Sequence, residues 1–153
     1  MKMAMRYAVA SLSLVIILAP ALIATRSFAQ TPRKLGKEQL VGHWQLVSVA
    51  IHGRAPYGDN PQGSMFFDSG GHYSVIVISG GRANDISYFG TYTVEDANNT
   101  ITLHVDASSG GGANVVGRDV KRLVTIDGDQ LIVVNELSSG SPGGVKVTWK
   151  RAN

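Results

Sequence analysis

The chain has 153 residues and contains no cysteine, so a domain of modest size must fold without disulfide bonds. Its 14 basic residues outnumber its 11 acidic residues, but Lys2, Arg6 and Arg26 all lie within the first 29 residues, where no acid occurs. Residues 30–153 therefore carry 11 charges of each sign. This balance argues against nucleic acid and anionic membrane surfaces as partners, because both bind basic patches.

The first 29 residues have the pattern of a secretory signal peptide. A basic start precedes an apolar run over residues 7–24, and Ser27-Phe28-Ala29 places small residues before a cut at Gln30. An uncleaved membrane anchor is the alternative, because about 18 apolar residues is within spanning length. Pro20 and the small residues at the cut favour removal. We therefore expect export to the periplasm or the extracellular space, with no stable membrane insertion after cleavage.

Short strand-like runs separated by turn residues follow along the rest of the chain. Residues 30–39 are polar and hold Pro32, which predicts an N-terminal strap outside the core of a domain over residues 40–153. No later run predicts a helix of three turns. Turn sequences at residues 68–71 and 127–129 supply the positive φ values of tight hairpins. The predicted strands cover residues 41–51, 63–68, 72–79, 86–95, 100–107, 115–127, 130–137 and 145–151.

Eight consecutive strands predict an all-β fold. Their connections are short or loop-like, so strands that are neighbours in sequence should pair antiparallel. Closing such a sheet removes its exposed edges. We predict an eight-stranded, antiparallel, up-and-down β-barrel, and the preference for it rests on the family resemblance given below. A β-sandwich is the structural alternative. A closed barrel of eight strands has an interior that can hold one small ligand.

Several segments resemble the bacterial lipocalin-like domain family. Gly42-His43-Trp44 opens the first predicted strand and Arg151 ends the last one, an arrangement that is similar to the lipocalin signature. Further segments resemble the family in the expected order: residues 57–63, 88–94, 128–131 and 149–151. The resemblance implies a lipocalin-like barrel whose floor is closed by Trp44 beside Gly42, with Arg151 packed across the indole.

Arg122 is a candidate for the barrel interior. Alternation along the strand over residues 115–127 places it on one face with Val120, Val124 and Ile126, as a lone cation among aliphatic side chains. One reading is that it reaches into the barrel, where burial demands an anion or several acceptors. The other is that its stem lies along apolar surface while its head reaches water.

His104 is a second candidate. It shares one face of the strand over residues 100–107 with Thr102 and Asp106, opposite the aliphatic face. That polar stripe predicts either an exposed face or a pocket histidine that donates to a ligand or transfers a proton, because the free pKa of histidine lies near neutrality. The chain lacks cysteine and shows no short spacing of metal ligands, so we predict neither a metal site nor a cofactor.

Tyrosines complete the predicted ligand-binding set. Tyr88 and Tyr92 share a strand face with Gly90 between them, which leaves a gap for a bend or a ligand. A tyrosine hydroxyl in an apolar cavity orients a ligand. The predicted ligand-binding residues are Tyr73, Tyr88, Tyr92, His104 and Arg122.

These patterns predict an exported lipocalin-like protein that binds a small, largely apolar ligand inside the barrel. The first alternative is an isomerase or cyclase acting on a small hydrophobic substrate, with His104, Arg122 and a tyrosine as acid, base and anion holder. The absence of a nucleophile motif argues against an enzyme. The second alternative is a periplasmic protein-binding barrel that uses residues 30–39 as exported protease inhibitors do, although those inhibitors usually contain a disulfide.

Overall fold

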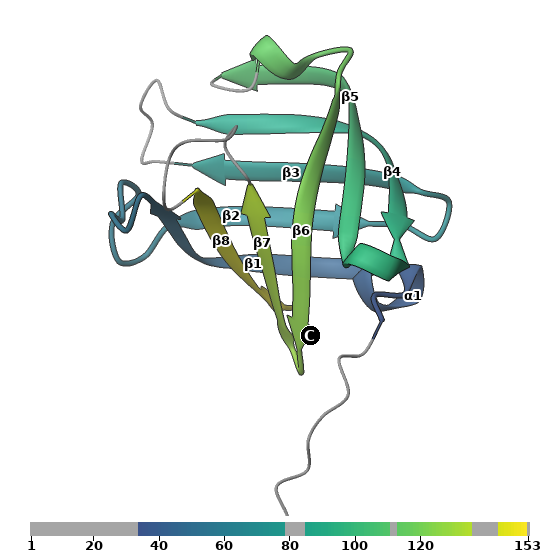
Figure 1. The fold of residues 1–153 in the computed structure, drawn as a ribbon. Helices are drawn as coiled ribbons and strands as arrows, with labels where there is room; N and C mark the ends of the chain where they lie inside the picture. The colour runs from purple at the N-terminus through teal and green to yellow at the C-terminus, as the bar shows by residue number, and fades with distance from the viewer. Residues whose placement is uncertain (1–33, 79–84, 111–112, 136–143, 153) are drawn as a thin grey trace, which may run out of the picture. The chain divides into compact units, whose positions relative to one another are not determined.

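The computed structural model describes residues 34–78, 85–110, 113–135 and 144–152; the predicted signal peptide lies outside them. Eight strands follow one another round a closed barrel in chain order, each antiparallel to its neighbours (Figure 1). The prediction of an all-β, eight-stranded, up-and-down barrel is therefore confirmed. The elements are α1 (Lys37–Leu40), β1 (Gly42–Ile51), β2 (Gln62–Phe67), β3 (His72–Ile78), β4 (Ile86–Glu95), η1 (Asp96–Asn98), β5 (Thr100–Gly110), η2 (Ala113–Val115), β6 (Asp119–Asp127), β7 (Gln130–Asn135) and β8 (Val145–Arg151). None of the helices in these ranges is long and apolar enough to cross a membrane.

The connection between β5 and β6 differs from the prediction. β5 continues to Gly110, through serines that were predicted to lie in a loop, because Ser109 pairs with Ser87 of β4. The 3₁₀-helix η2 follows, and β6 begins at Asp119 rather than at residue 115. Pairing with β4 therefore holds these serines in a strand, although serine by itself has little preference for extended structure.

A β-bulge in β5 accounts for Gly90 of β4. Asp106 has no partner in the ladder between the two strands, so β5 bends at this point. A Cβ atom at Gly90 would collide with the carbonyl oxygen of His104. The predicted gap between Tyr88 and Tyr92 is therefore filled by the backbone of the neighbouring strand and not by a ligand.

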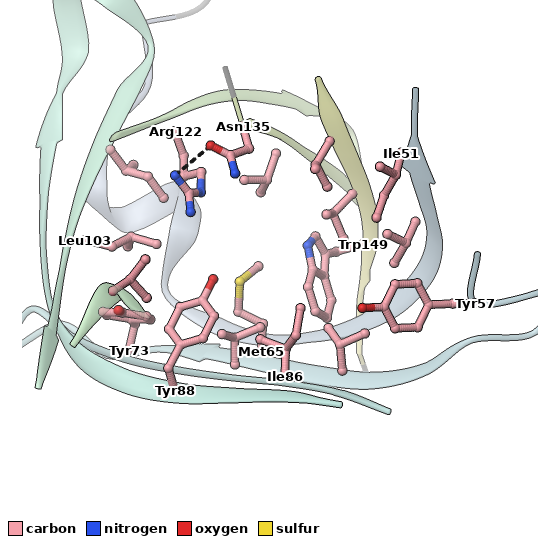
Figure 2. Close-up of a pocket in the computed structure, with 18 of the residues that line it drawn as sticks. Ile51, Tyr57, Met65, Tyr73, Ile86, Tyr88, Leu103, Arg122, Asn135 and Trp149 are labelled. Atoms are coloured by element: carbon pink, nitrogen blue, oxygen red, sulfur yellow. Dashed lines mark hydrogen bonds between the residues drawn. The ribbon is translucent and has the colours of Figure 1, made fainter. Parts of the chain in front are cut away.

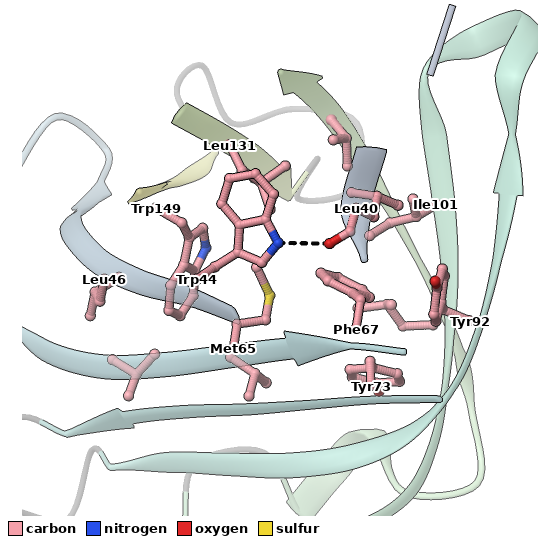
Figure 3. Packing of buried hydrophobic residues seen from close by; sticks show 14 of the residues in the cluster. Leu40, Trp44, Leu46, Met65, Phe67, Tyr73, Tyr92, Ile101, Leu131 and Trp149 are labelled. Carbon is pink, nitrogen blue, oxygen red and sulfur yellow. Dashed lines mark hydrogen bonds between the residues drawn. The ribbon is translucent and has the colours of Figure 1, made fainter. Parts of the chain in front are cut away.

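One end of the barrel, the floor, is closed by Trp44. Its indole is fully buried, and its Nε1–H donates to the carbonyl oxygen of Leu40 at 2.7 Å (Figure 3). The guanidinium of Arg151 lies 4.1 Å from the centre of the indole. The same guanidinium donates to the carbonyl oxygens of Val41 at 2.9 Å and Gln39 at 2.6 Å. The last strand is thereby joined to the segment that precedes the first.

Leu35, within the strap predicted over residues 30–39, belongs to the core, although the strap was predicted to lie outside it. Residues 30–33 of that strap lie outside the described residues. Leu35 and Leu40 are both buried in the floor, and the backbone N–H of Leu35 donates to the side-chain oxygen of Asn99 at 3.1 Å. Gly42 follows with a φ of +129°, and a Cβ there would lie 3.0 Å from Nη1 of Arg151. Glycine at this position therefore keeps room for the guanidinium.

Replacing Arg151 with Ala is expected to lower the free energy of unfolding by about 2–4 kcal/mol, because two hydrogen bonds from a charged donor and a cation–π contact are lost together. R151K keeps the charge without the planar fork, so it should recover less than half of that loss. Urea unfolding followed by circular dichroism measures both variants. In the matched control K150A, an exposed ion pair of 3.5 Å to Asp129 is lost, and the change should stay within about 0.5 kcal/mol. Equal effects of R151A and K150A would contradict the role given to Arg151.

Candidate functional site

A cavity of about 300 Å³ lies inside the barrel, in the half away from the floor (Figure 2). Every strand contributes to its wall, because alternate residues of each strand point inward. Met65 and Trp149 line the cavity and also lie beside Trp44 in the floor cluster (Figure 3). The lining residues are Val49, Ile51, Tyr57, Met65, Tyr73, Val75, Val77, Ile86, Tyr88, Ile101, Leu103, Asn114, Val115, Arg122, Val133, Asn135, Val145, Val147 and Trp149.

Arg122 is the charged side chain among the described lining residues, so the structure places it inside the barrel. Its Nη1 donates to Oδ1 of Asn135 at 2.9 Å and to the carbonyl oxygen of Lys121 at 2.8 Å. The hydroxyl of Tyr88 is close enough for the positive charge of Arg122 to oppose the rise that burial causes in its pKa. No Asp or Glu lines the cavity in the described part of the chain. Among the described residues the positive charge is therefore solvated by neutral dipoles, with no counter-ion in the cavity wall.

The hairpin of β6 and β7 brings Asn135 to Arg122. Asp127 pairs with Gln130 across a two-residue turn, and the ladder continues along both strands. The register that this turn sets places Arg122 opposite Asn135, and both side chains face inward. Sequence reasoning missed Asn135, although the predicted turn and its register were signals that could have found it.

Tyr73 and Tyr88 stand side by side in the cavity wall near Arg122. Their rings are edge-on, with centres 6.0 Å apart, and the Tyr73 hydroxyl donates to the carbonyl oxygen of His104 at 3.4 Å. Burial raises the pKa of both hydroxyls above its usual value, and the positive charge of Arg122 opposes part of that rise. Both tyrosines are therefore neutral hydrogen-bonding groups near pH 7 and not bases.

Tyr57 and Asn114 add polar groups to the wall that sequence reasoning missed. Tyr57 comes from the connection between β1 and β2, and Asn114 comes from η2. Burial raises the pKa of the Tyr57 hydroxyl, and the negative charge of Asp85 raises it further. Neither residue had a strand pattern from which its direction could be deduced.

Trp149 holds a buried donor in the wall of the cavity. Its side chain is 2 % exposed, and its Nε1–H has no acceptor among the residues that the structure describes. In Figure 2 the indole nitrogen lies on the edge of the ring that faces the cavity. A buried donor without an acceptor costs roughly 1–3 kcal/mol. Sequence reasoning assigned no such role to Trp149, because nothing in the sequence distinguishes its N–H from that of Trp44.

His104 lies outside the cavity, contrary to the prediction that it binds the ligand. Its Nδ1 is 2.7 Å from a carboxylate oxygen of Asp119, and its Nε2 is 3.7 Å from one of Asp106. Alternation along β5 turns Leu103 inward and His104 outward. Arg122 and His104 therefore lie on opposite sides of the barrel wall. The acid, base and anion holder predicted for an isomerase do not come together.

Tyr92 also lies away from the cavity, contrary to prediction, although it faces inward. It stands four residues from Tyr88 along β4, a distance of about 13 Å, and packs edge-on against Phe67 with ring centres 4.8 Å apart. Its hydroxyl donates to the carbonyl oxygen of Asp68 at 2.8 Å. Tyr92 therefore belongs to the floor.

The chain matches no protein-family model and no curated protein sequence. The resemblance to lipocalin-like proteins therefore remains a prediction from the sequence. Within the described ranges, no group of three or more His, Asp or Glu side chains is arranged to hold a metal ion.

Replacing Arg122 with Met is expected to leave the free energy of unfolding unchanged or to raise it by about 1 kcal/mol, because Met fills a similar volume without a desolvated charge. Urea unfolding measures the change. R151M is the matched comparison, since the guanidinium of Arg151 is held by an indole and two carbonyl oxygens, and it should be clearly destabilised. A loss of more than about 2 kcal/mol in R122M would make Arg122 a structural residue.

The two cavity tyrosines should make the fold sensitive to strongly alkaline pH. Their raised pKa values mean that the folded state keeps protons that the unfolded chain releases near about pH 10. Stability from these groups is fully present below that pH and is lost as the pH rises above it. We expect a shallower loss for the Y73F/Y88F double variant, measured by urea unfolding and tyrosinate absorbance. If the unfolding free energy of the wild-type protein fell with rising pH no more steeply than that of the double variant, the two tyrosines would not be the groups responsible.

Proposed function

We propose that this protein binds a small, largely apolar molecule inside the barrel. The observation that carries the proposal is the cavity, whose volume of about 300 Å³ lies at the lower end of the range for small-molecule sites. Its wall is mainly Val, Ile and Leu with a few polar groups, which is the usual composition of such sites. An eight-stranded barrel packed full of side chains has no comparable space.

The barrel supports binding without a large rearrangement. All eight strands are hydrogen-bonded on both sides, so the ladder holds the wall in place. The buried residues around Trp44 close one end of the barrel. An apolar ligand gains roughly 25 cal/mol for each Å² removed from water, and the polar groups set its orientation. The predicted signal peptide supports the further proposal that the protein acts as a carrier in the periplasm or outside the cell.

Saturable binding of N-phenyl-1-naphthylamine, a neutral apolar fluorophore, tests the proposal. We expect its fluorescence to rise with protein purified after expression of the whole chain, and the emission of Trp149 to fall as energy passes to the probe. W149F removes the tryptophan in the cavity and leaves Trp44 in the floor, so quenching should weaken in this variant.

Two neighbouring residues of β3 provide a matched pair of variants. Val75 lines the cavity, whereas Ile76 is 44 % exposed on the outer face. V75F should weaken binding of the fluorophore by at least about ten-fold by filling the space, while I76F should change it by less than about two-fold. Circular dichroism checks that both are folded, and V133F on another wall replaces V75F if it is not. Absence of saturable binding to the wild-type protein, or equal effects of both variants, would refute the proposal.

A further inference from the structure

The polar groups of the cavity define the class of ligand more narrowly; this inference rests on the proposed binding function. We propose that the ligand is an organic anion with a carboxylate head at Arg122, an apolar body, and a second oxygen acceptor at the Nε1–H of Trp149. The head, the apolar body and the second acceptor correspond to three successive inward-facing residue pairs along β7 and β8.

The head is assigned from the charge of Arg122. This guanidinium is half-buried in an aliphatic cavity, and its hydrogen-bond partners among the described residues are an amide oxygen and a backbone carbonyl oxygen. A cation in such surroundings lacks the compensation that a paired charge provides. A carboxylate would supply it through short, charge-assisted hydrogen bonds.

The guanidinium is held in position before any ligand arrives. Asn135 and the backbone of Lys121 hold Nη1 through two hydrogen bonds. A planar fork held in this way loses little freedom when it binds a carboxylate. Tyr88 stays protonated because burial raises its pKa, so its O–H can donate to the same anion.

The second acceptor is assigned from Trp149. Its indole is 2 % exposed, and the Nε1–H has no acceptor within the described residues. Trp44 provides the internal comparison, since its Nε1–H is satisfied by the carbonyl oxygen of Leu40 at 2.7 Å. A keto, ether or hydroxyl oxygen of the ligand would satisfy Trp149 in the same way and remove the cost of an unpaired donor.

The register of β7 and β8 sets the order of the two polar points. Asn135 pairs with Val145 at the level of Arg122, and Leu131 pairs with Trp149 four residues deeper, a distance of about 13 Å along the strand. The pair between these levels is Val133 with Val147, and both line the cavity. The ligand therefore has an apolar stretch between its anionic head and its second oxygen.

Competition against bound N-phenyl-1-naphthylamine tests the head. Decanoate should displace the fluorophore at a concentration at least about ten-fold lower than 1-decanol, which has the same body without the charge. R122Q should remove this difference. Lys121 is the matched control, because it is adjacent in sequence but faces outward and donates to Glu95 at 2.9 Å, so K121Q should preserve the difference. Urea unfolding of R122Q and R122M checks that both variants are folded, so that a lost preference for decanoate does not result from unfolding.

A series of decanoates with one keto group between C5 and C9 tests the second acceptor. At least one member should bind several-fold more tightly than decanoate to the wild-type protein. W149F should abolish that gain while changing the affinity for decanoate itself by less than about two-fold.

The outcomes separate this inference from the proposed function. Failure of the neutral fluorophore to bind refutes both. Fluorophore binding together with equal competition by decanoate and decanol, or with equal effects of R122Q and K121Q, overturns the anionic head and leaves the binding function standing. Absence of a gain across the keto series, or a gain that W149F retains, overturns the second acceptor.

Discussion

The guanidinium of Arg151 lies between the indole of Trp44 and the carbonyl oxygens of Gln39 and Val41. It joins the end of β8 to the segment before β1, at the seam where the barrel closes on itself. Because Arg151 and Trp44 are also partners in the β1–β8 ladder, this contact and the closure of the sheet reinforce each other. The closure of the floor depends on this contact.

Closure of the floor separates the roles of the two tryptophans. Trp44 is covered by α1 and finds an acceptor in Leu40, so its N–H contributes to the floor. Trp149 comes from the neighbouring strand and lies between that floor and the cavity, where its N–H meets no protein acceptor in the described part of the chain. One indole therefore stabilises the floor, while the donor of the other is the one that the proposed ligand would satisfy.

The two arginines show the same division. Arg151 is held by an aromatic face and backbone oxygens, which is an arrangement that stabilises the folded chain. Arg122 is held in an apolar cavity by neutral groups and has no counter-ion among the described lining residues, which is a costly arrangement for a charged group. Under the proposed function, the ligand would supply the interaction that Arg122 lacks, and the cost in stability would be kept for binding.

The sequence by itself determined the number and order of the strands and sorted the residues of three strands by face, because turn residues and two-residue alternation are local properties. It left open which of those faces points inward. It also predicted the pairing of Trp44 with Arg151, although only through a resemblance. Only the tertiary structure decided the level of each inward residue along the barrel, so it separated Tyr88 in the cavity from Tyr92 in the floor. It likewise decided which donors remain without an acceptor, because that depends on packing between strands that are distant in the chain.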